Sequence, residues 1–194
     1  MTEARIIFEM LGYWHMGTGS GKGFDYDAVV SKTAKKLPYI PGRTVKGLLR
    51  EAVLLLEEAG RVASGTTADL FGRADVDSRY DSAEGRIAFS SATLHPDPSA
   101  EPGWNNSLPD YLYAGIASTR IDERGQAVDQ SLRRIEVAIP AVLTASASCD
   151  DLSTTWVEVL KGAAPLVRMA GSHRHRGLGR VKVTVEGVDS GVTP

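Results

Sequence analysis

Cysteine and long apolar stretches are both scarce in this sequence. Cys149 is the only cysteine among the 194 residues, which excludes a disulfide framework and a zinc site built from thiolates. The longest apolar run, AVLLL at residues 52–56, is far shorter than a membrane span, and the opening MTEARIIFE lacks the basic and then apolar order of a signal peptide. We therefore expect a cytoplasmic protein with no membrane segment.

An excess of positive charge is also missing. The formal net charge is -2, which argues against nonspecific nucleic-acid binding, for which a basic protein is typical. The cations are nevertheless clustered at residues 32–50 and 173–182, while acidic residues concentrate at 57–84. One basic face is therefore compatible with the neutral balance, and solvated surface charge is the alternative.

A glycine-rich stretch, HMGTGSGKGFDYD at residues 15–27, looks like a phosphate-binding loop but does not fit the P-loop pattern. If the GK at residues 21–22 were the Gly-Lys pair of that pattern, Met16 and Gly23 would stand where a first glycine and a hydroxyl are required. The residues that follow also show no helical periodicity before Pro38, whereas a P-loop leads directly into a helix. Hydrolysis of ATP or GTP is therefore not favoured.

The composition predicts one globular domain with insertions. Hydrophobic residues at 42% and charged residues at 24% are ordinary for a soluble protein of this length. Apolar periodicity and turn signals predict a strand at residues 4–11, a helix from Thr44 to a stop at Gly60 and a short helix at 66–71. A strand at 85–94, a hairpin at 116–129 with its turn at 123–125 and a strand at 135–147 follow. The chain then continues with a helix capped by Asp150, Asp151 and Ser153 and broken at Gly162 and Pro165, and it ends with a strand at 180–188. This order predicts an α+β fold with a ferredoxin-like βαββαβ core, in which segments near 61–84 and 95–132 are insertions.

The segment LPYIPGRTVKGLLRE, residues 37–51, places two prolines and a glycine before the first long helix. Arg43, Lys46 and Arg50 surround its first turns, and the free N–H groups of a helix start can hold a phosphate. An ordinary capped helix with solvated cations is the alternative.

A second basic loop, GSHRHRGLGR at residues 171–180, contains three glycines, three arginines and two histidines. Glycines permit close approach of a ligand backbone, and guanidinium groups favour phosphate oxygens. A metal site on His173 and His175 is the rival hypothesis, but no third ligand stands nearby, whereas zinc takes four. A phosphate contact is therefore favoured.

Taken together, these segments resemble the RAMP (repeat-associated mysterious protein) superfamily of CRISPR-associated proteins, and more closely the backbone subunit of type III effector complexes. The motifs that carry the resemblance are, in chain order, HMGTGSGKG with a following aspartate, PYIPGRTVKGLLR, LFG, GRIAFSSATL, TRIDERGQAVDQSLRRIEV and GSHRHRGLGRVKV. They span residues 6–185. The resemblance implies a modified RNA-recognition-motif fold, in agreement with the order of elements above.

The resemblance also implies partners and RNA contacts. The partners are guide RNA, target RNA and other CRISPR effector subunits, with several copies or paralogues stacked along the guide. The segment IDERGQAVDQSL, residues 121–132, resembles the family's thumb, a hairpin that wedges into the guide–target duplex and exposes a target phosphodiester. The RNA-binding residues it implies are Gly17, Gly19, Ser20, Lys22, Arg43, Lys46, Arg50, Arg120, Ser172, His173, Arg174, His175 and Arg176.

Cleavage in such subunits is attributed to a loop aspartate between the glycine-rich segment and the proline-rich helix entry. Asp25 and Asp27 both qualify, and Asp27 is preferred because the run AVVSK follows it. The implied reaction is attack of a target ribose 2′-hydroxyl on the adjacent phosphate, with Asp27 accepting the proton or binding Mg²⁺ or another divalent cation. His15 is a further candidate catalytic residue, and a turn role for Asp27 is the alternative.

Two other functions remain open at this point. One is a guide-RNA-binding subunit of the same kind of complex that does not cleave. The other is a metal-independent nuclease that processes precursor guide RNA, with His15 or His173 as the acid or base.

Overall fold

The structure is a computed structural model that describes residues 2–19, 21, 25–73, 83–100, 108–150 and 153–188. Its main sheet contains β1 (Thr2–Met10), β4 (Ile87–Phe89), β8 (Val142–Cys149) and β9 (Val181–Val188) in the order β4-β8-β1-β9, and each neighbouring pair is antiparallel. A short strand, β5 (Thr93–Leu94), also pairs with β8. The expected α+β class with an antiparallel sheet is therefore confirmed.

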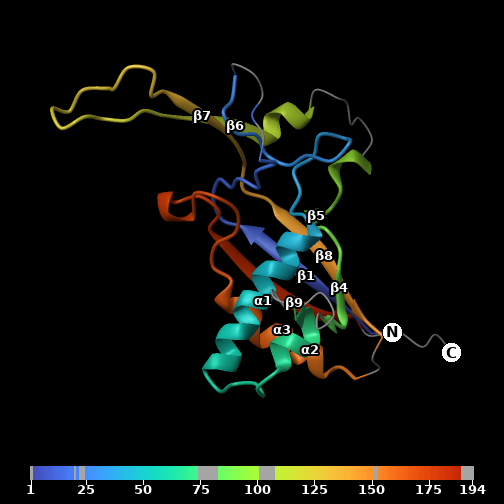
Figure 1. Cartoon of the computed structure of the whole chain (residues 1–194). Helices are drawn as coiled ribbons and strands as arrows, with labels where there is room; N and C mark the ends of the chain where they lie inside the picture. The colour runs from blue at the N-terminus through green and yellow to red at the C-terminus, as the bar shows by residue number, and fades with distance from the viewer. Residues whose placement is uncertain are drawn as a thin grey trace.

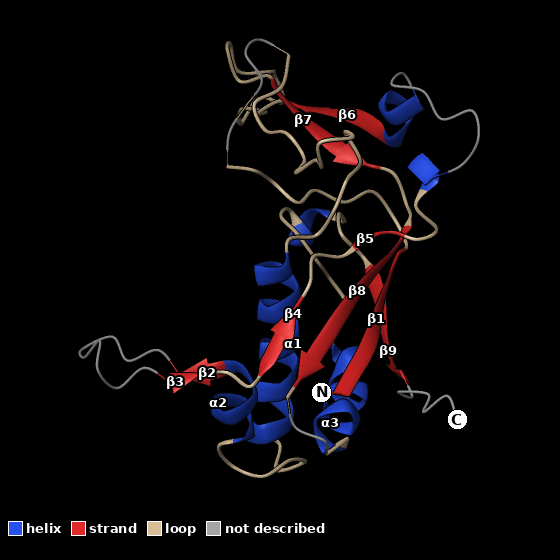
Figure 2. Ribbon diagram, turned by 90° about the vertical axis from the view of Figure 1, so that its right-hand side faces the viewer, coloured by secondary structure: helices blue, strands red, loops and turns tan. Residues whose placement is uncertain are grey.

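One face of this sheet is covered by helices and the other is polar. The helices α1 (Gly42–Glu58), α2 (Thr66–Phe71) and α3 (Thr155–Ala163) lie together on the covered face (Figures 1 and 2). Along β1, Ala4, Ile6 and Phe8 are buried, while Glu3 and Arg5 are exposed on the opposite side. The alternation of buried and exposed side chains along β1 therefore sets which face packs against the helices, with Ile7 as the apolar residue on the other face.

A second part of the chain lies beyond one end of the main sheet. It contains the antiparallel strands β6 (Tyr113–Ser118) and β7 (Arg133–Ala138), whose hairpin extends away from the rest of the molecule (Figure 1). The strands β2 (Gly72–Arg73) and β3 (Ala83–Glu84) form another two-stranded pair. Four 3₁₀ turns complete the described elements: η1 (Pro98–Ala100), η2 (Leu108–Leu112), η3 (Ala164–Leu166) and η4 (Arg174–Arg176).

The strand expected at residues 85–94 is interrupted. Its ends are β4 and β5, and between them Ala92 exchanges both backbone hydrogen bonds with Ile40, each at 2.9 Å, instead of continuing along β8. Ser90 marks the departure, since its hydroxyl accepts a hydrogen bond from the Ser146 N–H at 2.8 Å. The alternating pattern predicted the strand type correctly, but it could not predict a competing backbone partner.

The strand expected at residues 135–147 is two strands in different sheets. β7 ends at Ala138 and β8 begins at Val142. Pro140 lies between them and has no N–H group to donate, so a continuous ladder is interrupted there. The chain therefore passes from the projecting hairpin into the centre of the main sheet within three residues.

The helix boundaries follow the predictions closely, and the caps follow them in part. α1 begins at Gly42 rather than Thr44, with Pro41 at the cap position and no side-chain cap, while the Gly42 N–H donates to Ser91 Oγ at 3.1 Å. At the start of α3 the expected residue Ser153 accepts the Thr155 N–H on its Oγ at 3.2 Å, although Thr154 holds the cap position, and the expected Asp151 lies outside the described residues. Gly60, with φ of +66°, follows the end of α1 as predicted.

None of the helices in the described part of the chain is long and apolar enough to cross a membrane.

Candidate nucleic-acid interface

The glycine-rich loop after β1 is fixed to the base of the hairpin by Trp14. This indole is fully buried, and its Nε1 donates to the Ile139 carbonyl at 2.8 Å. The backbones of Trp14 and Ala138 exchange two hydrogen bonds, at 3.1 and 2.8 Å. These bonds therefore hold the start of the loop against the end of β7.

His15 joins three segments from inside the protein. It is 2% exposed, and its Nδ1 lies 2.6 Å from the Glu136 carbonyl oxygen on β7. Because a carbonyl only accepts, this nitrogen carries the proton. The His15 carbonyl oxygen accepts the Ser172 N–H at 2.9 Å, and the His15 ring lies edge-on to that of His173 with centroids 6.1 Å apart. This burial favours a structural role for His15 over the catalytic one.

The second basic loop is docked on the first through two glycines. Gly171 has φ of +92°, and a Cβ there would lie 2.5 Å from the His15 carbonyl oxygen. Gly179 has φ of +78°, and a Cβ there would lie 1.9 Å from the Ala170 carbonyl oxygen. Its N–H also donates to the Tyr13 carbonyl oxygen at 2.8 Å. A larger residue at Gly171 would separate the two loops, and one at Gly179 would separate the two ends of the second loop where the Tyr13 carbonyl is bound.

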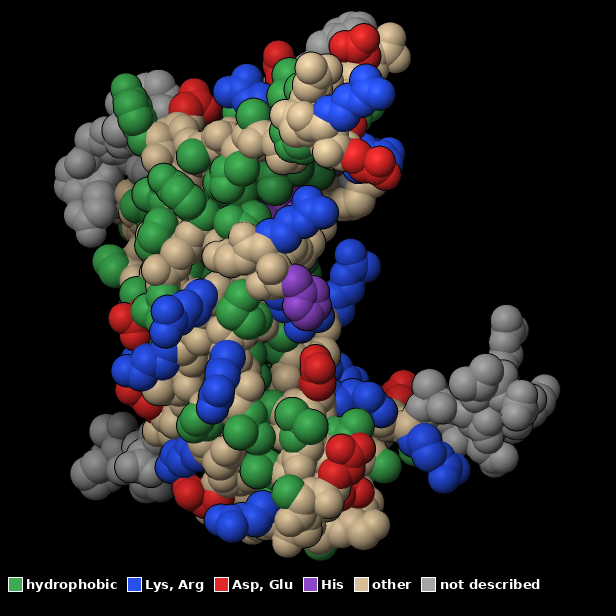
Figure 3. Space-filling view, turned by 90° about the vertical axis from the view of Figure 1, so that its left-hand side faces the viewer, with side chains coloured by type: hydrophobic (Ala, Val, Ile, Leu, Met, Phe, Trp, Pro, Cys, Tyr) green, Lys and Arg blue, Asp and Glu red, His purple; other side chains and the backbone are tan. Residues whose placement is uncertain are grey.

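A cavity of about 390 Å³ lies where three predicted RNA-binding segments meet. Its walls carry His15 and Gly17 from the first loop, Arg43 from the start of α1, and Ser172 and Arg174 from the second loop. Glu51 lines it too, so the side-chain charge of the cavity is one negative against two positive. On the face toward which the hairpin projects, Lys and Arg side chains and a histidine surround the middle of the molecule (Figure 3).

Lys46 and Arg50 do not share this cavity. They line a different one of about 700 Å³ together with Arg73 and Glu84. Because residues three and four apart are neighbours on a helix surface, Arg43, Lys46 and Arg50 lie along one face of α1 although they line different cavities.

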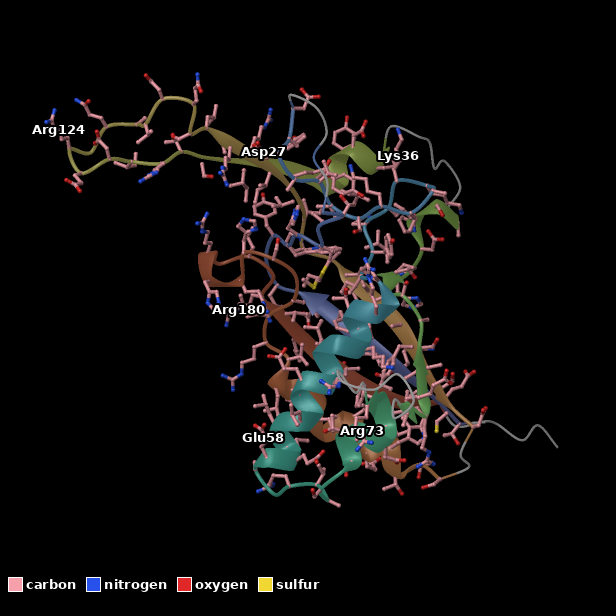
Figure 4. The ribbon with its side chains drawn as sticks, in the orientation of Figure 1. Asp27, Lys36, Glu58, Arg73, Arg124 and Arg180 are labelled. Atoms are coloured by element: carbon pink, nitrogen blue, oxygen red, sulfur yellow. The ribbon has the colours of Figure 1, made fainter. Side chains whose placement is uncertain are left out.

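Asp27 lies at the base of the hairpin, far from the tip that carries Arg124 (Figure 4). Its N–H donates to the Arg134 carbonyl oxygen at 2.8 Å, and its Oδ2 accepts the Arg134 N–H at 2.7 Å. Among the described residues no hydrogen bond to Asp27 Oδ1 is seen. The side chain is exposed, so one carboxylate oxygen is fixed by backbone while the other is free to meet a ligand.

A third cavity, of about 300 Å³, contains Asp27 and part of the second basic loop. Arg133 from β7 and His173 and Arg176 from the second loop line it as well. Asp25 is exposed in the preceding turn and does not line this cavity. The geometry therefore favours Asp27 over Asp25.

The remaining predicted RNA-binding residues are scattered. Gly19 is exposed with φ of +83°, and Arg120 is exposed on the hairpin, where its N–H donates to Ser131 Oγ at 3.0 Å. His175 is exposed in η4 and lines none of the three cavities above. Ser20 and Lys22 lie outside the described residues.

The hairpin itself is present with the predicted turn. Asp122 Oδ1 accepts the N–H groups of Arg124 and Gln126 at 2.9 and 2.8 Å, and Gly125 has φ of +78°. A backbone bridge joins Ile121 and Ala127 across it. The aspartate therefore fixes the turn by the same side-chain-to-backbone bonding that favours Asp in turns generally.

Sequence reasoning missed a buried acidic network next to the Asp27 loop. Glu136 is 6% exposed, and its carboxylate accepts Lys32 Nζ at 2.7 Å and the Val30 N–H at 3.1 Å. Lys32 Nζ also lies 3.9 Å from the centre of the Tyr113 ring, and the Tyr113 hydroxyl donates to the Lys36 carbonyl oxygen at 2.6 Å. Burial first, and then the charges of Glu136 and Asp110, raise the pKa of Tyr113 well above its usual range. The alternating RRIEVA pattern, with Glu136 between apolar residues, was the available signal.

The described residues include no group of three or more His, Cys, Asp or Glu side chains that could hold a metal ion. A zinc-type site at His173 and His175 therefore finds no support in this part of the chain.

The fold and the site together define an antiparallel α+β protein in which two glycine-rich basic loops meet at the start of a helix and at the base of a long hairpin. The chain belongs to the RAMP superfamily, whose family model matches residues 7–182. Among solved structures, it is similar to a chain of the type III-B Cmr-beta in the apo state, with a TM-score of 0.65 and 11% identity over 97% of this chain and 98% of that one. It is also similar to a chain of the type III-B Cmr-beta bound to cognate target RNA, with a TM-score of 0.70 and 11% identity over 94% and 96%. At such identity the similarity concerns the fold. None of the curated proteins matched the chain.

Proposed function

We propose that this chain is a guide-RNA-binding backbone subunit of a type III CRISPR effector complex and that it cleaves target RNA with Asp27 as its catalytic residue. Its partners would be guide RNA, target RNA and other effector subunits, with several copies or paralogues along the guide. Support comes from membership of the RAMP superfamily and from the fold it shares with chains of type III-B Cmr-beta structures, one of them bound to cognate target RNA. The observation that carries the proposal is that the loops expected to contact RNA line two cavities, each with residues from the second basic loop.

The core is proposed to be the ferredoxin-like βαββαβ arrangement. Reading β1, β4, β8 and β9 as its four strands, with α1 and α3 as its helices, gives the spatial order β4-β8-β1-β9. In that arrangement the second and third strands are neighbours and the first strand is central, as here. The hairpin and the β2–β3 pair are then additions to this core.

The cavity of about 390 Å³ is the proposed guide-RNA site. α1 has no acidic residue in its first turn, so its N-terminal end is electropositive and suits a phosphate. Arg43 and Arg174 supply the guanidinium groups, and Gly17 and Gly171 leave room for the approach of a sugar–phosphate backbone. Glu51 would keep phosphates toward the arginine side.

Asp27 is the proposed catalytic carboxylate. Its fixed backbone and free Oδ1 suit a group that must accept the 2′-hydroxyl proton in one orientation. The same oxygen is a fitting ligand for Mg²⁺, which takes one or two carboxylates, phosphate oxygens and waters rather than a full set of protein ligands. When bound, Mg²⁺ would stabilise negative charge on the phosphate oxygens. Arg133 and Arg176 would hold the scissile phosphate in the cavity they share with Asp27.

The test is cleavage by the complex assembled with its neighbouring subunits and carrying Asp27→Asn. We expect the variant to retain guide RNA of defined length and to lose at least 100-fold in cleavage rate, because general base catalysis contributes about 10²–10⁴. Asp25→Asn is the matched control, two residues away and outside the cavity, and should cleave normally.

Undiminished cleavage by Asp27→Asn would refute the catalytic assignment. An unaltered complex that retains guide RNA but leaves matched target RNA intact in Mg²⁺ would instead establish the non-cleaving function.

A further inference from the structure

We propose that His173 is a second catalytic residue, the general acid that protonates the leaving oxygen of the target RNA. The inference rests on the proposed function of Asp27 and extends it to the other side of the scissile bond. It starts from the structural difference between the two histidines that the sequence left as alternatives, since His15 is 2% exposed and His173 is exposed.

The backbone of His173 is in a conformation that only a few non-glycine residues adopt. Its φ and ψ are 59° and 26°, in the left-handed region. Strained backbone of this kind persists where surrounding contacts hold it, and it is concentrated at functional sites. Here the preceding Ser172 is held by the His15 carbonyl oxygen at 2.9 Å, and Gly177 closes the turn with φ of +82°.

The ring of His173 is also held in a defined orientation. Its Nδ1 lies 3.0 Å from Ser172 Oγ, and its plane is at 88° to the His15 ring. His15 in turn is fixed by the Glu136 carbonyl oxygen. With Nδ1 engaged by the serine hydroxyl, Nε2 is the nitrogen left for a ligand.

His173 and Asp27 line one cavity of about 300 Å³ from two different loops. A volume of this order accommodates a small group such as a phosphodiester with its flanking sugar atoms. The charged and titratable groups that face His173 are Asp27, His15, Arg133 and Arg176. The two arginines favour an anion bound beside His173.

The proposed step balances without a further reactant. The 2′-oxygen forms a bond to phosphorus while the bond from phosphorus to the 5′-oxygen breaks. The 2′-hydroxyl proton passes to the Asp27 carboxylate, and a proton from His173 Nε2 passes to the departing 5′-oxygen. The products are a 2′,3′-cyclic phosphate and a 5′-hydroxyl, and exchange with water returns both side chains to their starting states.

The test is a target RNA whose 5′-bridging oxygen at the cleavage position is replaced by sulfur, a leaving group that needs no protonation. The assembled complex would carry His173→Asn, because asparagine tolerates the left-handed backbone and cannot act as the acid. We expect at least a 100-fold loss on the oxygen substrate and a rate within a few-fold of the unaltered complex on the sulfur substrate. His95→Asn, at an exposed histidine outside the cavity and outside the predicted RNA-binding segments, is the control and should cleave both at the normal rate.

Two outcomes would overturn the proposal. One is normal cleavage of the oxygen substrate by His173→Asn. The other is an equal loss of rate on the oxygen and sulfur substrates, which would indicate a structural role for His173. Asp27→Asn should be slow on both substrates, so failure of the Asp27 assignment is recognised separately.

A second variant covers the case in which His173→Asn does not assemble. Glycine adopts the left-handed backbone of this position without strain, so His173→Gly should assemble and should likewise lose rate only on the oxygen substrate. Normal cleavage of the oxygen substrate by this variant, or an equal loss on both substrates, would refute the general acid.

Discussion

Replacing Gly179 by alanine tests how the second basic loop is held on the first. A Cβ at this position would lie 1.9 Å from the Ala170 carbonyl oxygen, whereas ordinary contacts begin at 3.4 Å, so the backbone must separate. That separation affects two hydrogen bonds of 2.8 Å, from the Ala170 N–H to the Gly179 carbonyl oxygen and from the Gly179 N–H to the Tyr13 carbonyl oxygen.

The magnitude follows from these contacts and from a matched control. Gly125 has the same φ of +78° but nothing within 4 Å of its Cβ position. Alanine at Gly125 therefore carries only the left-handed backbone cost, roughly 1–2 kcal/mol, partly offset by about 0.4–1 kcal/mol from the less flexible unfolded chain. Alanine at Gly179 adds the two hydrogen bonds at about 1 kcal/mol each. We expect Gly179→Ala to be about 2–3 kcal/mol less stable than Gly125→Ala.

Urea unfolding of the full chain, followed by tryptophan fluorescence, measures this difference in the free energy of unfolding. The dependence of the free energy of unfolding on urea concentration should be equal in the two variants, so the difference in stability should appear as a shift of the unfolding midpoint. Equal stability of the two variants would refute the docking of the loops through Gly179.

The remaining predictions concern the RNA site and the network beside it. The double variant Arg43→Ala with Arg174→Ala should lower guide-RNA affinity and reduce the slope of log affinity against log salt concentration by about 2. The control is Lys46→Ala with Arg50→Ala, which removes the same charge from a different cavity and should change affinity and slope less. Filter binding over a salt series would contradict this if the control lost as much affinity. Because the raised pKa of Tyr113 means that the folded state holds the phenol proton more tightly, the free energy of unfolding should fall as pH rises above the ordinary tyrosine value of about 10. Tyr113→Phe should lose about 1 kcal/mol of the free energy of unfolding at neutral pH, because the hydrogen bond to the Lys36 carbonyl oxygen is removed. It should also lose part of the fall in stability at alkaline pH. Urea unfolding at neutral and at alkaline pH would contradict this if the free energy of unfolding changed with pH by the same amount in both proteins.

Most of the fold could be predicted because its elements satisfy local rules. The alternation in β1 and β9, the apolar stripe of α1 and the short helix before Gly72 all follow from neighbouring residues. The splitting of residues 85–94 could not be predicted in the same way, because it depends on the backbone of Ile40, which is distant in the sequence from its partner Ala92. The break within residues 135–147 does have a local signal in Pro140, which the alternating pattern around it obscured.

The candidate site shows the same division. The family resemblance implied that Arg43, Ser172 and Arg174 all contact RNA, and these three residues line one cavity. The burial of His15 depends on the three-dimensional path of the loops. Local sequence does not encode that path, since a histidine before glycines is equally compatible with an exposed and a buried ring.

The hairpin beyond the β6–β7 ladder has a consequence for how the molecule can vary. Every residue from 119 to 130 is exposed, and the hydrogen bonds described for this segment, such as those of Asp122 and Ser131, stay within the hairpin. Its anchorage lies instead at Trp14 and Ile139, at the base. The length of the tip is thus decoupled from folding of the core, and insertions or deletions there would alter the reach of the protein while leaving its stability nearly constant.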